Sequence, residues 1–185
     1  MEATAVLQKT KWVIDAMHSE VQFKVKHLMI STVTGSFKTF SGTITSSSED
    51  FENADVQFSI DVKSIFTNQE MRDNHLRNAD FFEATKYPTI DFKSTSFKKV
   101  NGTDYRLEGN LTMKGVTKPV IAKVDFGGVA KDGQGNLKAG FEVTATINRV
   151  DFGVSYNALT EAGGVALGED IKLIANIQLA KAKAE

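Results

Sequence analysis

Apolar and polar residues alternate with a period of two over most of this chain. In residues 20–27, EVQFKVKH, the apolar residues Val21, Phe23 and Val25 are separated by single polar residues. This period is typical of a β-strand with one buried face, because successive side chains point to opposite sides of a sheet. The pattern predicts an all-β protein. It recurs in seven further segments, which span residues 32–44, 56–62, 89–96, 105–113, 120–126, 141–147 and 171–179.

Short turns separate the alternating segments. About eight amphipathic strands must bury their apolar faces in either a sandwich or a closed barrel. Long strands that follow one another through short turns favour a closed antiparallel barrel of about eight strands. A slip of the alternation at Phe40 predicts a bulge, and residues 11–15 are expected to open the sheet. Residues typical of turns are concentrated at 46–50, 100–104, 131–136 and 161–164.

Small residues interrupt the inward-facing series of several segments, and larger residues flank them. If the small residues lie at one level, a barrel of this size is hollow there and can hold one small ligand. If large and small residues interdigitate instead, Phe rings fill the space. The sequence leaves both arrangements open for Gly35, Ser94, Ser96, Gly109, Ala122, Ala145 and Ala175.

One charged insert breaks the alternation. Residues 72–82, RDNHLRNADFF, follow a T-x-x-E pattern at Thr67 and Glu70, which is the spacing of a helix capping box. We predict one short helix over residues 68–79, with Asp73 and Arg77 as i,i+4 partners. An isolated helix of this length is marginally stable, so we expect it to pack across an open end of the barrel. Either the helix only covers that end, or its basic residues contact the polar headgroup of a ligand.

Length and charge indicate the general class of the protein. Its 185 residues fit a single domain over residues 11–180, between a flexible segment 1–10 and a polar tail 181–185. Lys and Arg number 22 against 23 Asp and Glu, so nucleic acid is not expected as a partner. Cys is absent, which excludes thiol nucleophiles and disulfides. No stretch is apolar and long enough to span a membrane.

The cellular location stays open. The chain does not begin with a basic segment followed by an apolar one, as a secretion leader does. We expect a cytoplasmic protein, or a periplasmic protein if a leader was removed.

Sequence motifs for catalysis and metal binding are missing. No nucleophile elbow, zinc-protease motif or phosphate-binding loop occurs, and no pair of carboxylates stands out as an acid and a base. His27 continues an inward-facing series and is either a core residue or a ligand contact. The spacing of the three His residues supports no metal site. Residues 149–168 form a long segment able to fold over an apolar opening, with or without a ligand.

Several blocks of the sequence resemble the YceI-like family from about Trp12 to Leu179. The resemblance implies a lipocalin-like barrel with a helix beside it and an elongated apolar pocket. The implied ligands are a polyisoprenoid, an isoprenoid quinone, a polyprenyl phosphate or a fatty-acyl compound. No catalytic residues are established for the family, so none are carried over. The matching blocks are residues 12–28, 33–42, 64–68, 72–82, 87–92, 111–120 and 147–153.

Together, the alternation and the resemblance predict two sets of site residues. Basic residues at the mouth of a barrel suit a phosphate or carboxylate head. The expected apolar pocket consists of Phe23, Val25, His27, Phe37, Phe40, Phe58, Ile60, Phe81, Phe92, Leu111, Phe126, Phe141, Ile147 and Phe152. The expected polar mouth consists of Arg72, His75, Arg77, Lys114, Lys118 and Arg149.

Three functional interpretations follow. The first is a non-enzymatic carrier of a lipid-like molecule, which requires no cofactor and could hold an isoprenoid or quinone lipid. The second is an enzyme acting on an isoprenoid or acyl substrate with His27 or His75 as acid and base. The third is a stress-response structural module whose barrel is filled. A homodimer is compatible with all three.

Overall fold

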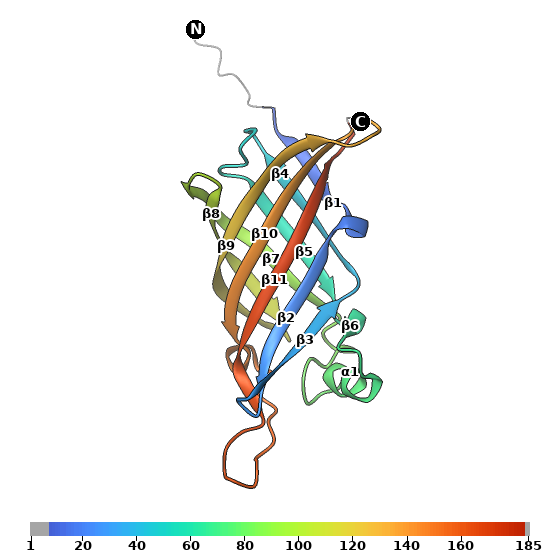
Figure 1. The fold of residues 1–185 in the computed structure, drawn as a ribbon, viewed down its shortest axis with the longest axis vertical. Helices are drawn as coiled ribbons and strands as arrows, with labels where there is room; N and C mark the ends of the chain where they lie inside the picture. The colour runs from blue at the N-terminus through green and yellow to red at the C-terminus, as the bar shows by residue number, and fades with distance from the viewer. Residues whose placement is uncertain (1–7, 184–185) are drawn as a thin grey trace.

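The polypeptide forms one antiparallel sheet that closes into an elongated barrel (Figure 1). The computed structural model describes residues 8–183. Pairing of the first strand with both the fourth and the last strand closes the sheet. The strands of the described chain are β1 (Thr10–Ile14), β2 (Glu20–His27), β3 (Ser31–Phe37), β4 (Phe40–Ser46), β5 (Asp55–Asp61), β6 (Ile65–Phe66), β7 (Thr89–Asn101), β8 (Asp104–Met113), β9 (Val116–Lys131), β10 (Leu137–Asn148) and β11 (Leu167–Lys181).

Three barrel strands are each built from two shorter ones. β1 and β2 pair with successive parts of β11, with Ile14 opposite Leu179 and Val21 opposite Ala175. β3 and β4 run along β2 and β1 in the same way, and β6 and β5 run along β3 and β4. Merging these pairs gives eight strands, which confirms the predicted closed antiparallel barrel.

The interruptions contain short turns and 3₁₀ helices. η1 (Ala16–His18) separates β1 from β2, and η2 (Val62–Ser64) separates β5 from β6. Between β3 and β4, Lys38 and Thr39 donate backbone hydrogen bonds to the Ser64 carbonyl at 3.1 Å and the Ser64 hydroxyl at 3.0 Å. The predicted bulge at Phe40 is therefore wrong, because the phase slip marks a break between two strands.

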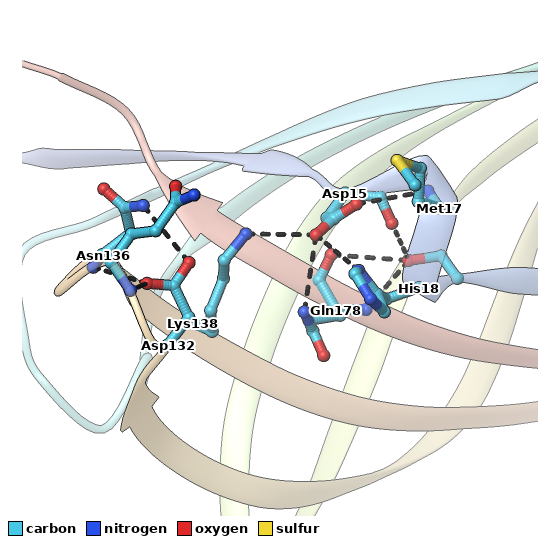
Figure 2. A network of polar contacts seen from close by, with 9 residues as sticks. Asp15, Met17, His18, Asp132, Asn136, Lys138 and Gln178 are labelled. Atoms are coloured by element: carbon cyan, nitrogen blue, oxygen red, sulfur yellow. Dashed lines mark hydrogen bonds and ion pairs between the residues drawn. The ribbon is translucent and has the colours of Figure 1, made fainter.

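Asp15 holds the break between β1 and β2 on the outside of the barrel (Figure 2). Its Oδ2 lies 2.9 Å from His18 Nδ1 and accepts a hydrogen bond from Lys138 Nζ at 3.1 Å. Gln178 Nε2 donates to the same oxygen at 3.4 Å. The hydrogen bonds from His18 and Lys138 lower the pKa of Asp15 to about 2.

Six aromatic side chains close the end of the barrel that holds the N-terminus of the described chain. Phe51 is 1% exposed and reaches inward from the connection between β4 and β5. Its ring centroid lies 5.2 Å from that of Trp12 and 5.1 Å from that of Phe141. We call this cluster the aromatic floor, and its members are Trp12, Phe51, Phe97, Tyr105, Phe126 and Phe141.

Two inward glycines lie beneath Phe rings of neighbouring strands. A Cβ at Gly35 would overlap the Phe23 ring, and one at Gly109 would overlap the Phe92 ring and the Lys93 carbonyl. Small residues at these positions therefore create space for rings rather than an empty level. Three other predicted small residues, Ala122, Ala145 and Ala175, do border a cavity.

The predicted helix is present as α1 (Glu70–Arg77), shorter than the expected residues 68–79. Gln69, not Thr67, caps it, because the Gln69 side chain accepts from the Met71 N–H at 3.1 Å. Thr67 instead donates from its N–H at 2.8 Å and from its hydroxyl at 2.5 Å to Asp73. The expected capping box at Thr67 and Glu70 is therefore wrong.

Arg77 does not pair with Asp73 as expected. It donates to the carbonyls of Lys63 at 2.9 Å and Ile65 at 3.1 Å, because its side chain reaches η2 and β6. Asp73 and Arg77 thus both tie α1 to the neighbouring strand. A third 3₁₀ helix, η3 (Arg149–Phe152), begins the connection from β10 to β11.

The expected terminal segments fall only partly within the described chain. β1 begins at Thr10 and β11 ends at Lys181, each one residue inside an expected terminal segment. Residues 1–7 of the expected flexible segment and residues 184–185 of the expected tail lie outside the described residues. Over residues 8–183, the structure contains no helix with the length and apolar character needed to cross a membrane.

Candidate ligand-binding cavity

A cavity of about 480 Å³ occupies the barrel between the aromatic floor and α1. This volume lies in the range of small-molecule sites, roughly 300–1,000 Å³. Phe51, Phe97 and Phe141 form its closed end. At the opposite end it is bordered by Leu76, by Phe81 and Phe82 after α1, and by the connection between β10 and β11.

The strands place most of the predicted pocket residues on the cavity wall. Their inward alternation explains this, since every second residue of a barrel strand faces the interior. Those that line the cavity are Phe23, Val25, His27, Phe37, Phe58, Ile60, Phe81, Phe92, Leu111, Phe141 and Ile147. His27 is exposed rather than a core residue, and so lies at the open end of the wall.

Three predicted pocket residues do not line the cavity. Phe126 stacks on Phe141 with ring centroids 4.9 Å apart and is held within the aromatic floor. Phe152 is only 2% exposed and packs into the core from η3. Phe40 begins β4 just after the strand break and packs against Phe58 at 6.0 Å.

Some wall residues were not selected from the sequence. Phe51 lies in a turn at φ 63°, so no alternation indicates its inward position. Thr67, Tyr156 and Asn157 also come from irregular segments. The inward series of the last strand does carry a period-two signal that could have identified its wall residues, namely Ile171, Leu173 and Ile177.

Only three of the six predicted mouth residues reach the cavity, namely Arg72, His75 and Arg149. Arg77 is committed to the carbonyls of η2 and β6. Lys114 donates to the carbonyls of Ala79 at 3.2 Å and Gly153 at 3.3 Å, so it links the segment after α1 to η3. Lys118 is exposed on β9.

Arg149 is 3% exposed and donates hydrogen bonds only to backbone carbonyls. Its acceptors are Gly168 O at 2.8 Å, Val154 O at 2.6 Å, Tyr156 O at 2.9 Å and Leu167 O at 3.4 Å. No ion pair among the described residues involves Arg149. Burial lowers its pKa. The guanidinium thus brings a charge to the cavity wall, where carbonyl dipoles and the more distant carboxylate of Glu169 offset it.

Arg72 is held by a single neighbouring residue. Its Nε donates to the Thr67 hydroxyl oxygen at 2.7 Å and its Nη2 to the Thr67 carbonyl at 2.6 Å. Together with Arg149, it brings two guanidinium groups to this end of the cavity. Among the cavity-lining residues that the structure describes there is no Asp or Glu, although the buried Asp73 accepts from the Thr67 hydroxyl that Arg72 contacts.

His75 joins α1 to the connection between β10 and β11. Its ring centroid lies 5.0 Å from Phe81 and 4.9 Å from Tyr156, and these two rings are 5.0 Å apart. His75 Nε2 lies 2.8 Å from Asp80 Oδ2. Asp80 does not line the cavity, and its side chain is 51% exposed. Within residues 8–183, no group of three His, Asp or Glu side chains is placed to hold a metal ion.

Comparisons with known proteins agree with the closed barrel. A Campylobacter jejuni YceI protein is 33% identical, with a TM-score of 0.72 over 87% of this chain and 91% of that chain. BcnA of Burkholderia cenocepacia shares the fold at 24% identity and a TM-score of 0.75, over 89% of this chain and 98% of that chain. A polyisoprenoid binding domain from Saccharophagus degradans shares it at 15% identity and a TM-score of 0.69, over 92% and 98%.

The sequence relatives cover the same region. A UPF0312 protein of Staphylococcus aureus strain N315 is 38% identical over 170 residues, which are 91% of this chain and 96% of the relative. The profile of the YceI-like domain matches residues 12–179. The resemblance noted from the sequence blocks is confirmed, and the chain belongs to the YceI-like family.

Proposed function

We propose that this protein binds a lipid-like amphiphile and holds its apolar chain inside the barrel without altering it. The observation that carries this proposal is an apolar cavity of about 480 Å³ with aromatic rings at one end and two guanidinium groups at the other. Each buried CH₂ group contributes about 0.8 kcal/mol, so a long tail binds well without specific polar contacts. The Saccharophagus domain of the same fold, described as polyisoprenoid-binding, supports this class of ligand.

The headgroup lies, in this proposal, at the α1 end beside Arg72 and Arg149. Two guanidinium groups without a carboxylate on the wall favour an anionic head, because charge-assisted hydrogen bonds are the stronger ones. Polyprenyl phosphates and fatty acids fit this description best, and neutral isoprenoid quinones fit the tail alone. No cofactor takes part in the proposed binding.

An enzyme is the second candidate, and His75 is the observation that favours it. His75 lines the cavity and is paired with Asp80, as a general base with an orienting carboxylate would be. No Ser lines the cavity in the described chain, so the pair lacks a hydroxyl nucleophile from Ser. Conversion of a bound lipid that is lost in His75→Ala would favour the enzyme over the carrier.

Native mass spectrometry of the purified protein, followed by solvent extraction, tests the proposed function. We expect a bound mass that extracts as an isoprenoid or acyl compound of unchanged structure. If the protein is recovered empty, polyprenyl phosphates and quinones are added and the melting temperature is measured, since a ligand of the folded state raises it. No adduct and no shift with either class would reject the carrier.

A further inference from the structure

Two neighbouring loops at the α1 end of the barrel carry five of the protein's exposed large apolar side chains. Three belong to the hairpin between β2 and β3, and two to the connection between β10 and β11 (Figure 1). We call this group the tip patch, and its members with their exposed fractions are Leu28 (42%), Met29 (69%), Ile30 (83%), Leu159 (81%) and Val165 (43%).

The two segments of the tip patch are in direct contact and border the cavity. The Leu28 N–H donates to the Ala166 carbonyl at 2.7 Å, and Leu159 pairs with Val165. The chain neighbours of these residues, His27, Ala158 and Ala166, line the cavity. The tip patch therefore lies directly beside the open end of the cavity.

The hairpin displays its apolar side chains in an unfavourable backbone conformation. Leu28 and Met29 have φ values of 52° and 59°, in a left-handed region that bulky residues rarely adopt. The paired residues His27 and Ser31 enclose a three-residue loop, and such loops usually place Gly at the left-handed position. Strain of this kind tends to occur where function requires it.

The charge and hydrogen bonds of the tip patch suit a lipid phase rather than a polar partner. Residues 28–37 contain no charged side chain, and residues 157–167 contain only Glu161. Several backbone N–H groups are already satisfied internally, as an apolar phase requires. Ile30 donates to His27 O at 3.2 Å, Thr160 to Gly164 O at 2.8 Å and Ala166 to Ala158 O at 2.9 Å.

We propose that the tip patch inserts into the surface of a lipid bilayer, with the mouth of the cavity facing the membrane. The cargo then passes between bilayer and barrel along an apolar path. The bilayer is assigned from the tip patch itself, while the passage of cargo rests on the proposed function. Because the tip patch is almost uncharged, insertion depends on apolar contact and takes place on zwitterionic phosphatidylcholine.

Flotation of the full chain with phosphatidylcholine vesicles tests the proposal. We expect the wild type to float with the vesicles at low and high salt alike. The combined variant Met29→Ser, Ile30→Ser and Leu159→Ser should lower the partition coefficient by about tenfold or more, from the apolar area it removes. The matched control, Met17→Ser, Val100→Ser and Val129→Ser, removes three other exposed apolar side chains and should float like the wild type.

Several outcomes would overturn the docking proposal. These are a wild type that stays with the buffer, an equal loss in the control, or binding that needs anionic lipid and disappears in salt. A different result would be a wild type that does not bind vesicles and sediments as a dimer, with a tip variant that sediments as a monomer. In that case the tip patch joins two copies of this chain instead.

A separate titration with farnesyl phosphate below its micellar concentration distinguishes docking from cargo binding. The tip variant should bind this probe with unchanged affinity, which supports a role in docking alone. If wild type floats through the tip patch while neither farnesyl phosphate nor the lipid classes above bind, the proposed function fails and the docking surface stands. A tip variant that has lost probe affinity would overturn the docking role, because these residues would then belong to the cargo site.

Discussion

Arg72 and Arg149 reach the same cavity but differ in how far each guanidinium is committed. Arg149 donates to four carbonyls and holds the two ends of the connection between β10 and β11. Arg72 donates to Thr67 alone, and its Nη1 makes no hydrogen bond within the described residues. Arg72 is thus the better candidate to contact a headgroup, whereas Arg149 shapes the site.

Replacement of Arg72 tests headgroup recognition. Arg72→Gln should weaken binding of a polyprenyl phosphate or fatty acid by about tenfold or more, because a hydrogen bond to a charged group contributes roughly 1.5–3 kcal/mol. Binding of a neutral quinone should change little. Lys118→Gln is the control, because it removes an exposed cation that does not line the cavity. Equal losses for both lipids, measured by titration, would contradict the anionic head.

Asp15 makes the free energy of unfolding of the barrel depend on pH in the acidic range. Its pKa is lowered to about 2, so the folded state favours the carboxylate. This contribution is fully present above the ordinary value of 3.8 and is lost as the pH falls from about 4 to about 2. The Asp15 side chain is 16% exposed, and with partial hydration the contribution is about 1 kcal/mol.

Asp15→Asn should therefore lower the free energy of unfolding by about 1 kcal/mol at neutral pH. It should also make stability less dependent on pH between about 4 and 2. Denaturant unfolding at several pH values measures both effects. If the free energy of unfolding changed with pH in the same way for the variant and the wild type, the contacts of Asp15 with Lys138 and His18 would not stabilise the fold.

The Asp15 cluster could not be predicted from the sequence. Its partners Lys138 and Gln178 are 123 and 163 residues away along the chain, and no local pattern links them. By contrast, the wall residue Phe23 could be predicted, because its inward position depends only on its neighbours in one strand. For single residues, the local alternation predicts whether a side chain faces inward. Which distant residues it contacts depends on how the barrel closes.

Among the elements, α1 is fastened to the barrel through buried Asp73. Asp73 is 4% exposed and accepts two hydrogen bonds from Thr67 at the end of β6. Asp73→Ala removes both and leaves the buried Thr67 N–H without its acceptor. Such a loss costs about 1–3 kcal/mol.

We expect hydrogen exchange in Asp73→Ala to accelerate over residues 67–77 while the central strands stay protected. The local unfolding of an element held by few contacts explains this pattern. Asp73→Asn keeps an acceptor oxygen and serves as the milder control. Uniform acceleration across the barrel would show that α1 and the strands unfold as one unit.

Element types were easier to predict than element ends. The short length of the predicted helix indicated that it needs support, yet its true cap, Gln69, was not the expected one. A positive φ of 63° at Asn68 separates Thr67 from the helix and turns its side chain toward Asp73. The break between β3 and β4 was missed because it depends on a distant partner: Lys38 and Thr39 donate to Ser64, which lies about 25 residues further along the chain.

For the whole molecule, the size of the cavity is the property to test. Ala145 lines it from β10, while the neighbouring Thr146 is exposed. Ala145→Phe should fill part of the space and lower lipid affinity by about tenfold or more, as the buried length of tail falls. Thr146→Phe adds the same group on the outer face and should leave affinity unchanged.

Calorimetric titration with one lipid measures both variants, and thermal unfolding shows whether they are folded. Equal affinity of Ala145→Phe and the wild type would place the ligand outside the barrel. The sequence alone left a hollow and a filled barrel equally open. The structure shows that rings cover Gly35 and Gly109 and that a cavity nevertheless remains. The sequence could not predict this, because the ring positions depend on the register between strands.

The aromatic floor gives the barrel a blind end. If the barrel binds a lipid tail as proposed, the tail can advance from the α1 end only until it meets Phe51, with its head beside Arg72 and Arg149. The proposed carrier would then select ligands by chain length: each added unit deepens the fit until the floor is reached, and any further unit pushes the head out toward the solvent.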